Sequence, residues 1–490
     1  MRIPAEYEAI ESLEADTLHE ACGVFGIFQN TDAAAHTALG LHALQHRGQE
    51  AAGIVTFDGA RYQTERRMGL VGDHFTKRAI IERLQGEMAI GHVRYSTTGE
   101  TVMRNVQPLF ADLDSGGFAL CHNGNLTNAL TLRKELIKAG AIFQSTTDTE
   151  AILHLVARST KSHFTEKFIE ALLQIEGGYA LVGMTNKKLV GARDPLGIRP
   201  LVLGCLGKSY VLASETCALD IIDAEFVREV ENGEVVVITK DGIESHRPFP
   251  KRRARPCIFE YIYFSRPDSI ADGRCIYDVR KAMGQQLARE APADADVIIP
   301  VPDSGVPAAI GYAQESGVPF ELGIIRNHYV GRTFIEPEQQ IRKLGVKLKH
   351  SANREAVRGN RVVLLDDSIV RGTTSVKIVQ MMYEAGAKEV HMRIASPPIT
   401  HPDFYGIDTP DQSKLLAANH DLEGMREYIG ADSVSFLSIE GIYKAMGIDE
   451  RDSKNPQFTD HCFTGDYPTR LLDREGTPSQ RQLSFLAEAG

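Results

Sequence analysis

The sequence of 490 residues lacks three features: long apolar runs, an excess of basic residues and a disulfide framework. Each absence excludes a class of protein. Apolar runs such as 297–301 and 362–365 have the size of strands and are far shorter than the roughly 18 residues of a membrane span. Basic residues are not in excess, because 54 Lys and Arg against 65 Asp and Glu give a net charge of −11. We therefore expect no membrane or nucleic-acid partner, and any phosphate must bind at a local site.

The seven cysteines form no CxxC pair and no even disulfide framework. Cysteines without a pairing pattern are typical of proteins in the reducing cytoplasm, where we expect the chain to reside. The first 21 residues carry six acidic residues and one basic residue, whereas a secretory signal needs a basic start and an apolar stretch. We interpret residues 1–21 as a leader or propeptide that is removed, with a disordered tail as the alternative.

The length favours two domains with short extensions. Short strands and interspersed helical patterns over residues 22–245 predict an α+β domain of layered sheets and helices. Residues 246–256 hold three prolines and five Arg or Lys, and we interpret them as a linker or, alternatively, an exposed rim of either domain. Alternating helices and strands over residues 257–466 predict an α/β domain with a mainly parallel sheet. We assign no role to residues 467–490.

The hydrophobic patterns also predict individual elements. The strands are expected at 22–28, 89–93, 180–184, 201–203, 210–213, 234–239, 297–301 and 361–365, and the helices at 33–45, 128–139, 149–158, 279–290, 306–316 and 375–385.

The stretch RVVLLDDSIVRGTTS, residues 361–375, carries the strongest local signal. Asp366 and Asp367 end an apolar strand, and ligands of open α/β sheets bind at the carboxyl ends of strands. Adjacent carboxylates suit ribose hydroxyls and Mg²⁺. Gly372 lets the backbone approach a phosphate, and the hydroxyls of Thr373 and Thr374 lie where a helix start offers unpaired N–H groups.

This stretch resembles the signature of type I phosphoribosyltransferases, which bind 5-phosphoribosyl pyrophosphate (PRPP). The resemblance implies that Asp366 and Asp367 contact the ribose and the metal. It also implies that the loop holds the 5-phosphate through Ser368, Arg371, Gly372, Thr373 and Thr374.

Two further segments fit the same resemblance. The loop 302–305 follows another apolar strand and is implied to hold the pyrophosphate, with Ser304 taking part in metal binding. The stretch RNHYVGRTF runs into a basic segment at 342–349, and together they resemble a mobile lid in which Arg332 closes over pyrophosphate. A solvated basic face is the alternative.

Cys22 directly follows the acidic leader, so removal of residues 1–21 would make it the first residue. Its α-amine, with a reference pKa of roughly 7.7–8.0, could then act as general base for the thiol. Arg94 could bind a substrate carboxylate, and Asp148 could bind a substrate ammonium. Asn123 and the Gly124 N–H could stabilise a developing oxyanion. Together these groups describe a site for glutamine.

The histidines near these motifs, His46, His92 and His122, are interpreted as structural. Cys121 and His122 are neighbours on a predicted strand, where successive side chains point to opposite faces, so we expect no Cys–His pair there. The set as a whole resembles the glutaminase domain of the N-terminal-nucleophile amidotransferases. That resemblance implies Cys22 as nucleophile, Asn123 and Gly124 as oxyanion hole, and Arg94 with Asp148 as the glutamine clamp.

A glutaminase half followed by a PRPP-binding half resembles the amidophosphoribosyltransferase family, from residue 22 to about 466. The implied reaction starts de novo purine synthesis: ammonia from glutamine displaces pyrophosphate from PRPP and gives 5-phosphoribosylamine and glutamate. Family resemblance further implies Mg²⁺, a homotetramer and feedback inhibition by purine nucleotides. Coupling of the two sites through lid closure is a hypothesis from the basic segment.

Some relatives with such a leader carry a [4Fe–4S] cluster on four cysteines. Here Cys257 and Cys462 match two of those places, while Asp403 and Thr459 occupy the others. We therefore expect no cluster. Two other functions are weighed as alternatives: a glutamine–sugar-phosphate amidotransferase, which the loop 366–374 disfavours, and a PRPP-sensing regulator, which would have no use for a glutaminase site.

Overall fold

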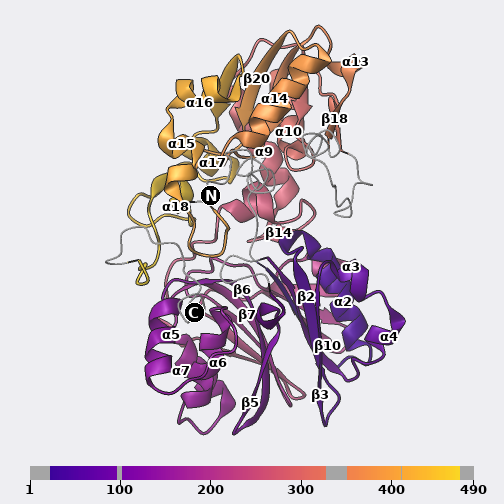
Figure 1. Cartoon of the computed structure of the whole chain (residues 1–490), viewed down its shortest axis with the longest axis vertical. Coiled ribbons are helices and arrows are strands. Elements are labelled where there is room, and N and C mark those ends of the chain that lie inside the picture. Colours follow the sequence, from indigo (N-terminus) through magenta and orange to yellow (C-terminus); the bar gives the residue numbers. More distant parts are fainter. Residues whose placement is uncertain (1–21, 96–101, 327–349, 410, 475–490) are drawn as a thin grey trace, which may run out of the picture.

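The structure is a computed structural model that describes residues 22–95, 102–326, 350–409 and 411–474. The chain forms two halves that lie one above the other in Figure 1, with the earlier part of the sequence below and the later part above. Within the described residues, no helix is both long and apolar enough to cross a membrane.

The first half contains two antiparallel sheets packed face to face (Figure 1). The seven-stranded sheet runs in the order β11 (Glu225–Glu229), β9 (Val202–Leu206), β10 (Ser209–Ala213), β1 (Gly23–Phe28), β4 (Met88–Arg94), β2 (Ala51–Phe57) and β3 (Tyr62–Met68). The six-stranded sheet runs in the order β13 (Gly242–His246), β12 (Val235–Thr239), β8 (Leu189–Arg193), β7 (Gly177–Thr185), β6 (Gly116–Leu126) and β5 (Leu109–Leu113).

Helices cover the outer face of each sheet, which gives four layers. The helices on the seven-stranded sheet are α2 (Ala33–Ala43), α3 (Val71–His74), α4 (Arg78–Ile81) and α8 (Cys217–Asp220). Those on the six-stranded sheet are α5 (Ala129–Lys138), α6 (Thr149–Arg158) and α7 (Phe164–Leu172). Between the sheets, residues such as Val24, Val182 and Leu212 are fully buried, and a Cβ at Gly26 would lie 2.7 Å from Val182. The sheets therefore pack too closely there for a larger side chain.

The second half is built on a four-stranded parallel sheet. Its order is β16 (Val297–Pro300), β19 (Arg361–Asp366), β20 (Glu389–Ile394) and β21 (Ser433–Phe436). Helices α9 (Ile276–Glu290), α10 (Val306–Ser316) and α17 (Ile439–Ala445) pack on one face, and α14 (Thr373–Ala385) and α16 (Leu422–Ile429) on the other. Because both faces are covered, β19 is a continuous apolar run, as parallel strands usually are.

The remaining elements are short. They are the hairpins β14 (Ile270–Ala271) with β15 (Arg274–Cys275) and β17 (Ile324–Arg326) with β18 (His350–Ala352), the helices α13 (Arg354–Val357), α15 (Leu416–Asn419) and α18 (His461–Thr464), the 3-10 turns Gln45–Arg47, Met103–Asn105 and Gln412–Lys414, and the π-helical turn Glu260–Phe264.

The predicted fold class is confirmed: layered sheets and helices come first, and a parallel α/β sheet follows. The helices at 149–158 and 306–316 have the predicted bounds. The helix expected at 375–385 was wrong at its start, because α14 begins at Thr373. Gly372, in the left-handed conformation, lets the chain enter the helix two residues early.

The last described segment, residues 467–474, contacts both halves. In the second half the Tyr467 hydroxyl donates to the carbonyl of Pro402 at 2.8 Å. In the first half the Asp473 carboxylate accepts from the backbone N–H groups of Leu130 and Thr131 at 2.7 and 2.9 Å, at the start of α5. The segment, to which the sequence assigned no role, therefore supplies a cap for a helix of the other half.

Candidate active sites

Cys22 lies at the entrance to β1, and its side chain is buried beside Arg94. The antiparallel pairing of Gly23 with Val93 places the two residues next to each other at the ends of their strands. Burial raises the pKa of the Cys22 thiol to about 11, and the nearby Arg94 guanidinium lowers it only in part. The thiol is therefore protonated at neutral pH and needs a base to become a nucleophile.

Arg94 ends β4 and is held from one side by the backbone carbonyl of Asn105, which accepts from Nη1 at 3.1 Å. Asn105 in turn exchanges two hydrogen bonds with Thr146, one between the side chains at 2.7 Å and one from the Thr146 N–H at 2.9 Å. This arrangement fixes the guanidinium close to Cys22, on whose thiol its charge acts.

Asn123 and Gly124 lie side by side on β6. Asn123 is fully buried, and within the described residues neither its Nδ2 nor its Oδ1 has a hydrogen-bond partner. Gly124 has a φ of +132°, and a Cβ there would lie 2.0 Å from the carbonyl oxygen of Gly178. A buried amide without a partner is costly, so this pair is suited to receive an oxyanion.

Asp148 immediately precedes α6 and is buried. Its Oδ2 accepts from the N–H of Leu126 at 3.0 Å, and its Oδ1 lies 3.5 Å from Nδ1 of His122. Burial favours the neutral acid, but His122 and the Leu126 N–H outweigh it and hold the pKa of Asp148 below its ordinary value. The carboxylate charge, which also acts on Cys22, is suited to a substrate ammonium.

The histidines near Cys22 are engaged elsewhere. His92 Nε2 bonds the carbonyl of His122 at 3.1 Å, and burial lowers the pKa of His92 to about 3, so this ring is neutral. The Cys121 thiol faces the carbonyls of Gly91 and Val182, on the other side of the strand from His122. These contacts agree with structural roles for the histidines.

At the second site, Asp366 ends β19 at the carboxyl edge of the parallel sheet, and Asp367 is the residue that follows. The N–H of Asp367 donates to Asp366 Oδ1 at 2.9 Å, and the hydroxyl of Ser368 donates to Asp367 Oδ1 at 2.6 Å. Burial raises the pKa of Asp367, against the hydrogen bonds of Ser304 and Ser368 and the charge of Arg280. A divalent cation beside these oxygens would restore the charged form.

Ser304 reaches this edge because β16 and β19 are parallel neighbours whose carboxyl ends coincide. Gly372 has a φ of +80°, and a Cβ there would lie 2.8 Å from the side chain of Leu416. A glycine is therefore required, and Thr373 and Thr374 enter the first turn of α14. The oxygens of Ser304, Asp366 and Asp367 fit a magnesium ion, which prefers hard oxygen ligands. Arg332 and the basic segment 342–349 lie outside the described residues.

Known proteins match both halves. Residues 92–220 match the glutamine amidotransferase domain, and residues 267–395 match the phosphoribosyl transferase domain. The amidophosphoribosyltransferase of Rhizobium etli is 63% identical over 486 residues, which is 98% of each chain. That of Bacillus subtilis is 49% identical and covers 96% of this chain and 98% of its own.

The chain belongs to the amidophosphoribosyltransferase family.

The expected glutamine amidotransferase and phosphoribosyltransferase activities are thereby confirmed, as is a place at the first step of purine biosynthesis. A solved structure of the Bacillus subtilis glutamine PRPP amidotransferase complexed with ADP and GMP has a TM-score of 0.87 at 48% identity. It covers 92% of this chain and 98% of its own.

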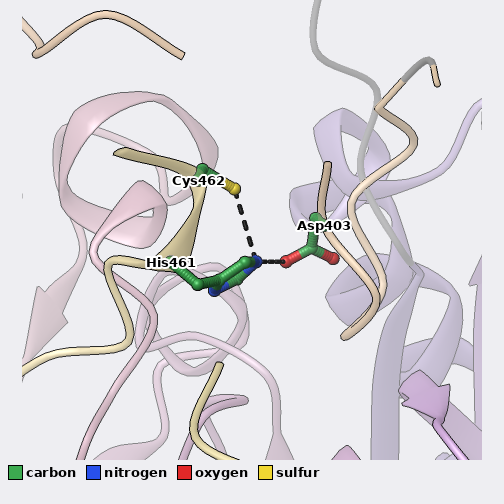
Figure 2. Close-up of side chains that lie close together, drawn as sticks. All are labelled: Asp403, His461 and Cys462. Carbon is green, nitrogen blue, oxygen red and sulfur yellow. Dashed lines mark hydrogen bonds and ion pairs between the residues drawn. The ribbon is translucent and has the colours of Figure 1, made fainter. Parts of the chain in front are cut away.

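One region of this amidophosphoribosyltransferase decides whether a [4Fe–4S] cluster would fit. Figure 2 shows Asp403, His461 and Cys462 converging on one imidazole nitrogen. His461 Nε2 lies 2.9 Å from Asp403 Oδ2 and 3.4 Å from Cys462 Sγ, and the Thr459 hydroxyl donates to the carbonyl of Arg255 at 2.5 Å. The four places supply two thiols instead of four, and the Asp403 carboxylate contacts His461 there, so the residues do not fit the cluster.

Sequence reasoning missed two side chains that lie beside the candidate glutamine site. Asn105 positions Arg94, and Gln107 accepts from the His122 N–H at 2.8 Å while donating to Thr149 Oγ1 at 3.0 Å. Both lie in the connection 102–108, which has no hydrophobic period. The only signal there is the presence of two amide side chains, and the structure buries residues 105–108 while Met103 stays exposed.

Proposed function

We propose that Cys22, Arg94, Asn123, Gly124 and Asp148 carry out the glutamine half of the reaction. Arg94 binds the substrate α-carboxylate and Asp148 its α-ammonium, which leaves the side-chain amide beside Cys22. Removal of residues 1–21 makes Cys22 the first residue, and its α-amine takes the thiol proton. The need for a base is supported by the burial of the thiol.

The sulfur then attacks the amide carbon, and the carbonyl oxygen becomes an oxyanion that accepts from Asn123 Nδ2 and the Gly124 N–H. Collapse of this intermediate breaks the carbon–nitrogen bond while the α-ammonium of Cys22 returns its proton to the leaving nitrogen, which releases ammonia and leaves a glutamyl thioester. Water hydrolyses the thioester to glutamate and regenerates the thiol. Ammonia passes to the second site through a water-poor passage, because protonation in water would remove its nucleophilic lone pair.

At the second site, ammonia attacks C1 of PRPP with inversion and pyrophosphate leaves. Asp366 and Asp367 bind the ribose hydroxyls and, with Ser304, a magnesium ion. Bound Mg²⁺ would neutralise charge on the leaving pyrophosphate. The 5-phosphate lies in the loop of Ser368, Arg371, Gly372, Thr373 and Thr374, at the start of α14. We assign Arg332 to a lid over the pyrophosphate.

The observation that most supports the glutamine half is the buried Asn123 amide without a hydrogen-bond partner in the described structure. Substitution Asn123→Ala is expected to lower kcat for glutamine hydrolysis by about 10²–10³-fold, with KM little changed, because the donor acts only on the oxyanion. Asn128→Ala is the matched control: this buried amide already bonds the carbonyl of Gln174. A kcat of Asn123→Ala equal to that of Asn128→Ala would contradict the assignment.

The whole reaction is tested by measuring glutamate and pyrophosphate released from glutamine and PRPP. We expect PRPP-dependent release of both in equal amounts. Transfer to fructose 6-phosphate instead would indicate a sugar-phosphate amidotransferase, and PRPP binding without turnover would indicate a regulator. The mass and first residue of the purified chain test whether residues 1–21 are removed.

Four further properties belong to this proposal. The enzyme is inhibited by purine nucleotides, in keeping with the ADP and GMP complex of its Bacillus relative. It acts as a homotetramer in the cytoplasm, where its cysteines, all unpaired in the described chain, remain reduced.

It holds no [4Fe–4S] cluster, because Asp403 and Thr459 stand where cysteines are needed. A stoichiometric iron and sulfide content of the purified protein would refute the last statement.

A further inference from the structure

A buried group of charged side chains joins the two halves, and none of its members was given a role by the sequence. Its centre is Glu260, whose carboxylate is almost completely buried. Arg47 Nη2 donates to Glu260 Oε2 at 2.5 Å, and Arg199 Nη1 donates to Oε1 at 3.3 Å. Both arginines have fully buried side chains and belong to the first half, whereas Glu260 belongs to the second. A buried carboxylate held by two buried guanidiniums makes this contact between the halves specific.

On the glutamine side, the contact leads directly to Arg94. Arg47 ends a 3-10 turn, and the next residue, Gly48, packs on the backbone of Arg94: a Cβ there would lie 2.6 Å from the Arg94 nitrogen. Two residues further on, the N–H of Glu50 donates to the carbonyl of Arg94 at 3.1 Å. A shift of Arg47 therefore moves the backbone against which the glutamine clamp rests.

On the PRPP side, the contact leads to Asp367. Glu260 opens the π-helical turn Glu260–Phe264, and the hydroxyl of Ser265 donates to Glu260 Oε2 at 2.8 Å. Arg280 of α9 holds the same turn, donating to the carbonyls of Tyr261 and Ser265 at 2.9 and 2.8 Å. The charge of Arg280 also acts on the carboxyl of Asp367. Geometry links the turn to the same loop: Ile262 and Phe264 belong to one hydrophobic core with Leu365, which precedes Asp366, and with Val370 of the loop 368–374, so a shift of this loop reaches the turn that carries Glu260.

We propose that Glu260 is a positioning residue that couples glutamine hydrolysis to PRPP binding, by transmitting the position of the turn 260–265 to Arg47 and the Arg94 clamp. The proposal rests on the proposed function and adds a route through the interior, distinct from any lid. Arg47 also pairs with Glu215 of the first half and Arg199 donates to the carbonyl of Tyr405, so the role of the Glu260 charge is to tie both arginines to the turn, and a neutral amide there would weaken that tie. A change at one site then alters the other through a packed, hydrogen-bonded connection.

The test measures glutamate release with and without PRPP and, separately, pyrophosphate release with ammonia in place of glutamine. For Glu260→Gln we expect the stimulation of glutamine hydrolysis by PRPP to fall about tenfold. Unstimulated hydrolysis should stay within about twofold of wild type, because Arg47 keeps its ion pair with Glu215 and so its place beside the clamp. The ammonia-dependent reaction should do the same, because Glu260 is not part of the proposed PRPP site. Glu260→Asp keeps the charge on a shorter side chain and should recover part of the stimulation.

The matched control is Glu234→Gln. Glu234 is also fully buried and paired with an arginine, Arg228 Nη1 donating at 2.8 Å, but both residues lie within the first half. The control should lose stability and keep its stimulation. Wild-type stimulation in Glu260→Gln, or the same loss in the control, would overturn the inference.

If Glu260→Gln does not fold, Glu260→Asp decides: stimulation equal to wild type overturns the proposal, and reduced stimulation with an intact ammonia-dependent rate supports it. Failure of the proposed function itself is distinguishable, because wild-type protein would then release no glutamate in response to PRPP.

Discussion

The proposed glutamine site takes its residues from four separate segments, at Cys22, Arg94, Asn123 and Asp148, whereas the proposed PRPP site takes most of its residues from the single stretch 366–374. The first set is buried among the layers of an antiparallel sandwich. The second lies at the edge of a parallel sheet, where a strand ends and a helix begins. The comparison teaches that one site depends on how the whole half folds, and the other on local chain geometry.

The largest expected effect separates the two sites completely. Cys22→Ser should lower the glutamine-dependent rate by at least about a thousandfold, because a buried hydroxyl is a far weaker nucleophile than a thiolate. The ammonia-dependent rate should remain, since the PRPP site has no contact with this side chain. Pyrophosphate release with glutamine and with ammonia measures both. Loss of both rates in a folded variant would break the comparison, because it would mean that the sites are not separable.

A substitution at the proposed PRPP site should lower both the glutamine-dependent and the ammonia-dependent rate. Asp367→Asn is expected to lower the glutamine- and ammonia-dependent rates alike by about a hundredfold, or ~2.7 kcal/mol, because the neutral side chain holds magnesium poorly. The matched control is Asp296→Asn, at the opposite, amino end of the same strands, where Asp296 pairs with Arg361 at the surface. The control should leave both rates unchanged. An equal effect of the two substitutions would argue against a metal and ribose site at the carboxyl edge.

A pH profile sharpens the comparison at the glutamine site. The thiol of Cys22 has a pKa of about 11 and His92 one of about 3, so neither titrates near neutrality. The α-amine of a freed Cys22 does, with a reference pKa of roughly 7.7–8.0. Below that value it is protonated and cannot accept the thiol proton, so kcat/KM for glutamine should fall about tenfold per pH unit.

The profile should then level off above about pH 8 and fall again only where the substrate ammonium bound by Asp148 itself loses its proton. Asp148 adds no step in this range, because its pKa is held below the ordinary value and its carboxylate stays charged as pH falls to about 5. Initial rates of glutamate release between pH 5.5 and 9.5 test this expectation. A single step near pH 6.5 would instead assign the base to a histidine.

The smallest expected effect concerns stability. Asp473→Ala removes the carboxylate that caps α5 and should lower the free energy of unfolding by about 1 kcal/mol. In a chain of this size the shift in Tm should be about 2 °C. Asp421→Ala, which removes a cap from α16 in the other half, is the control for a cap supplied from within its own domain. Calorimetry that resolves the two halves should show the first substitution acting on the glutaminase half and the second on the other.

The sequence predicted that the residues of the proposed PRPP site lie between a strand end and a helix, because strand, carboxylates, glycine and hydroxyls follow one another in a single stretch. Alternating strands and helices also predicted the parallel sheet. The positions of Asn105, Gln107 and Glu260 were out of reach, because their partners are 41, 15 and 213 residues away in the chain. Such contacts form only once the layers have assembled, and they produce no periodic pattern in the local sequence. The early start of α14 was missed for the opposite reason: one left-handed glycine overrides a helix pattern.

The crossing of residues 467–474 into the first half has a consequence for how the protein is made. The ribosome synthesises Ala129–Lys138 more than 300 residues before Asp473, the group that satisfies the first amides of that helix. Until Asp473 has been synthesised, these amides can bond only to water, so the newly made first half lacks about 1 kcal/mol of its final stability. The first half thus reaches its full stability only after the second half has been made.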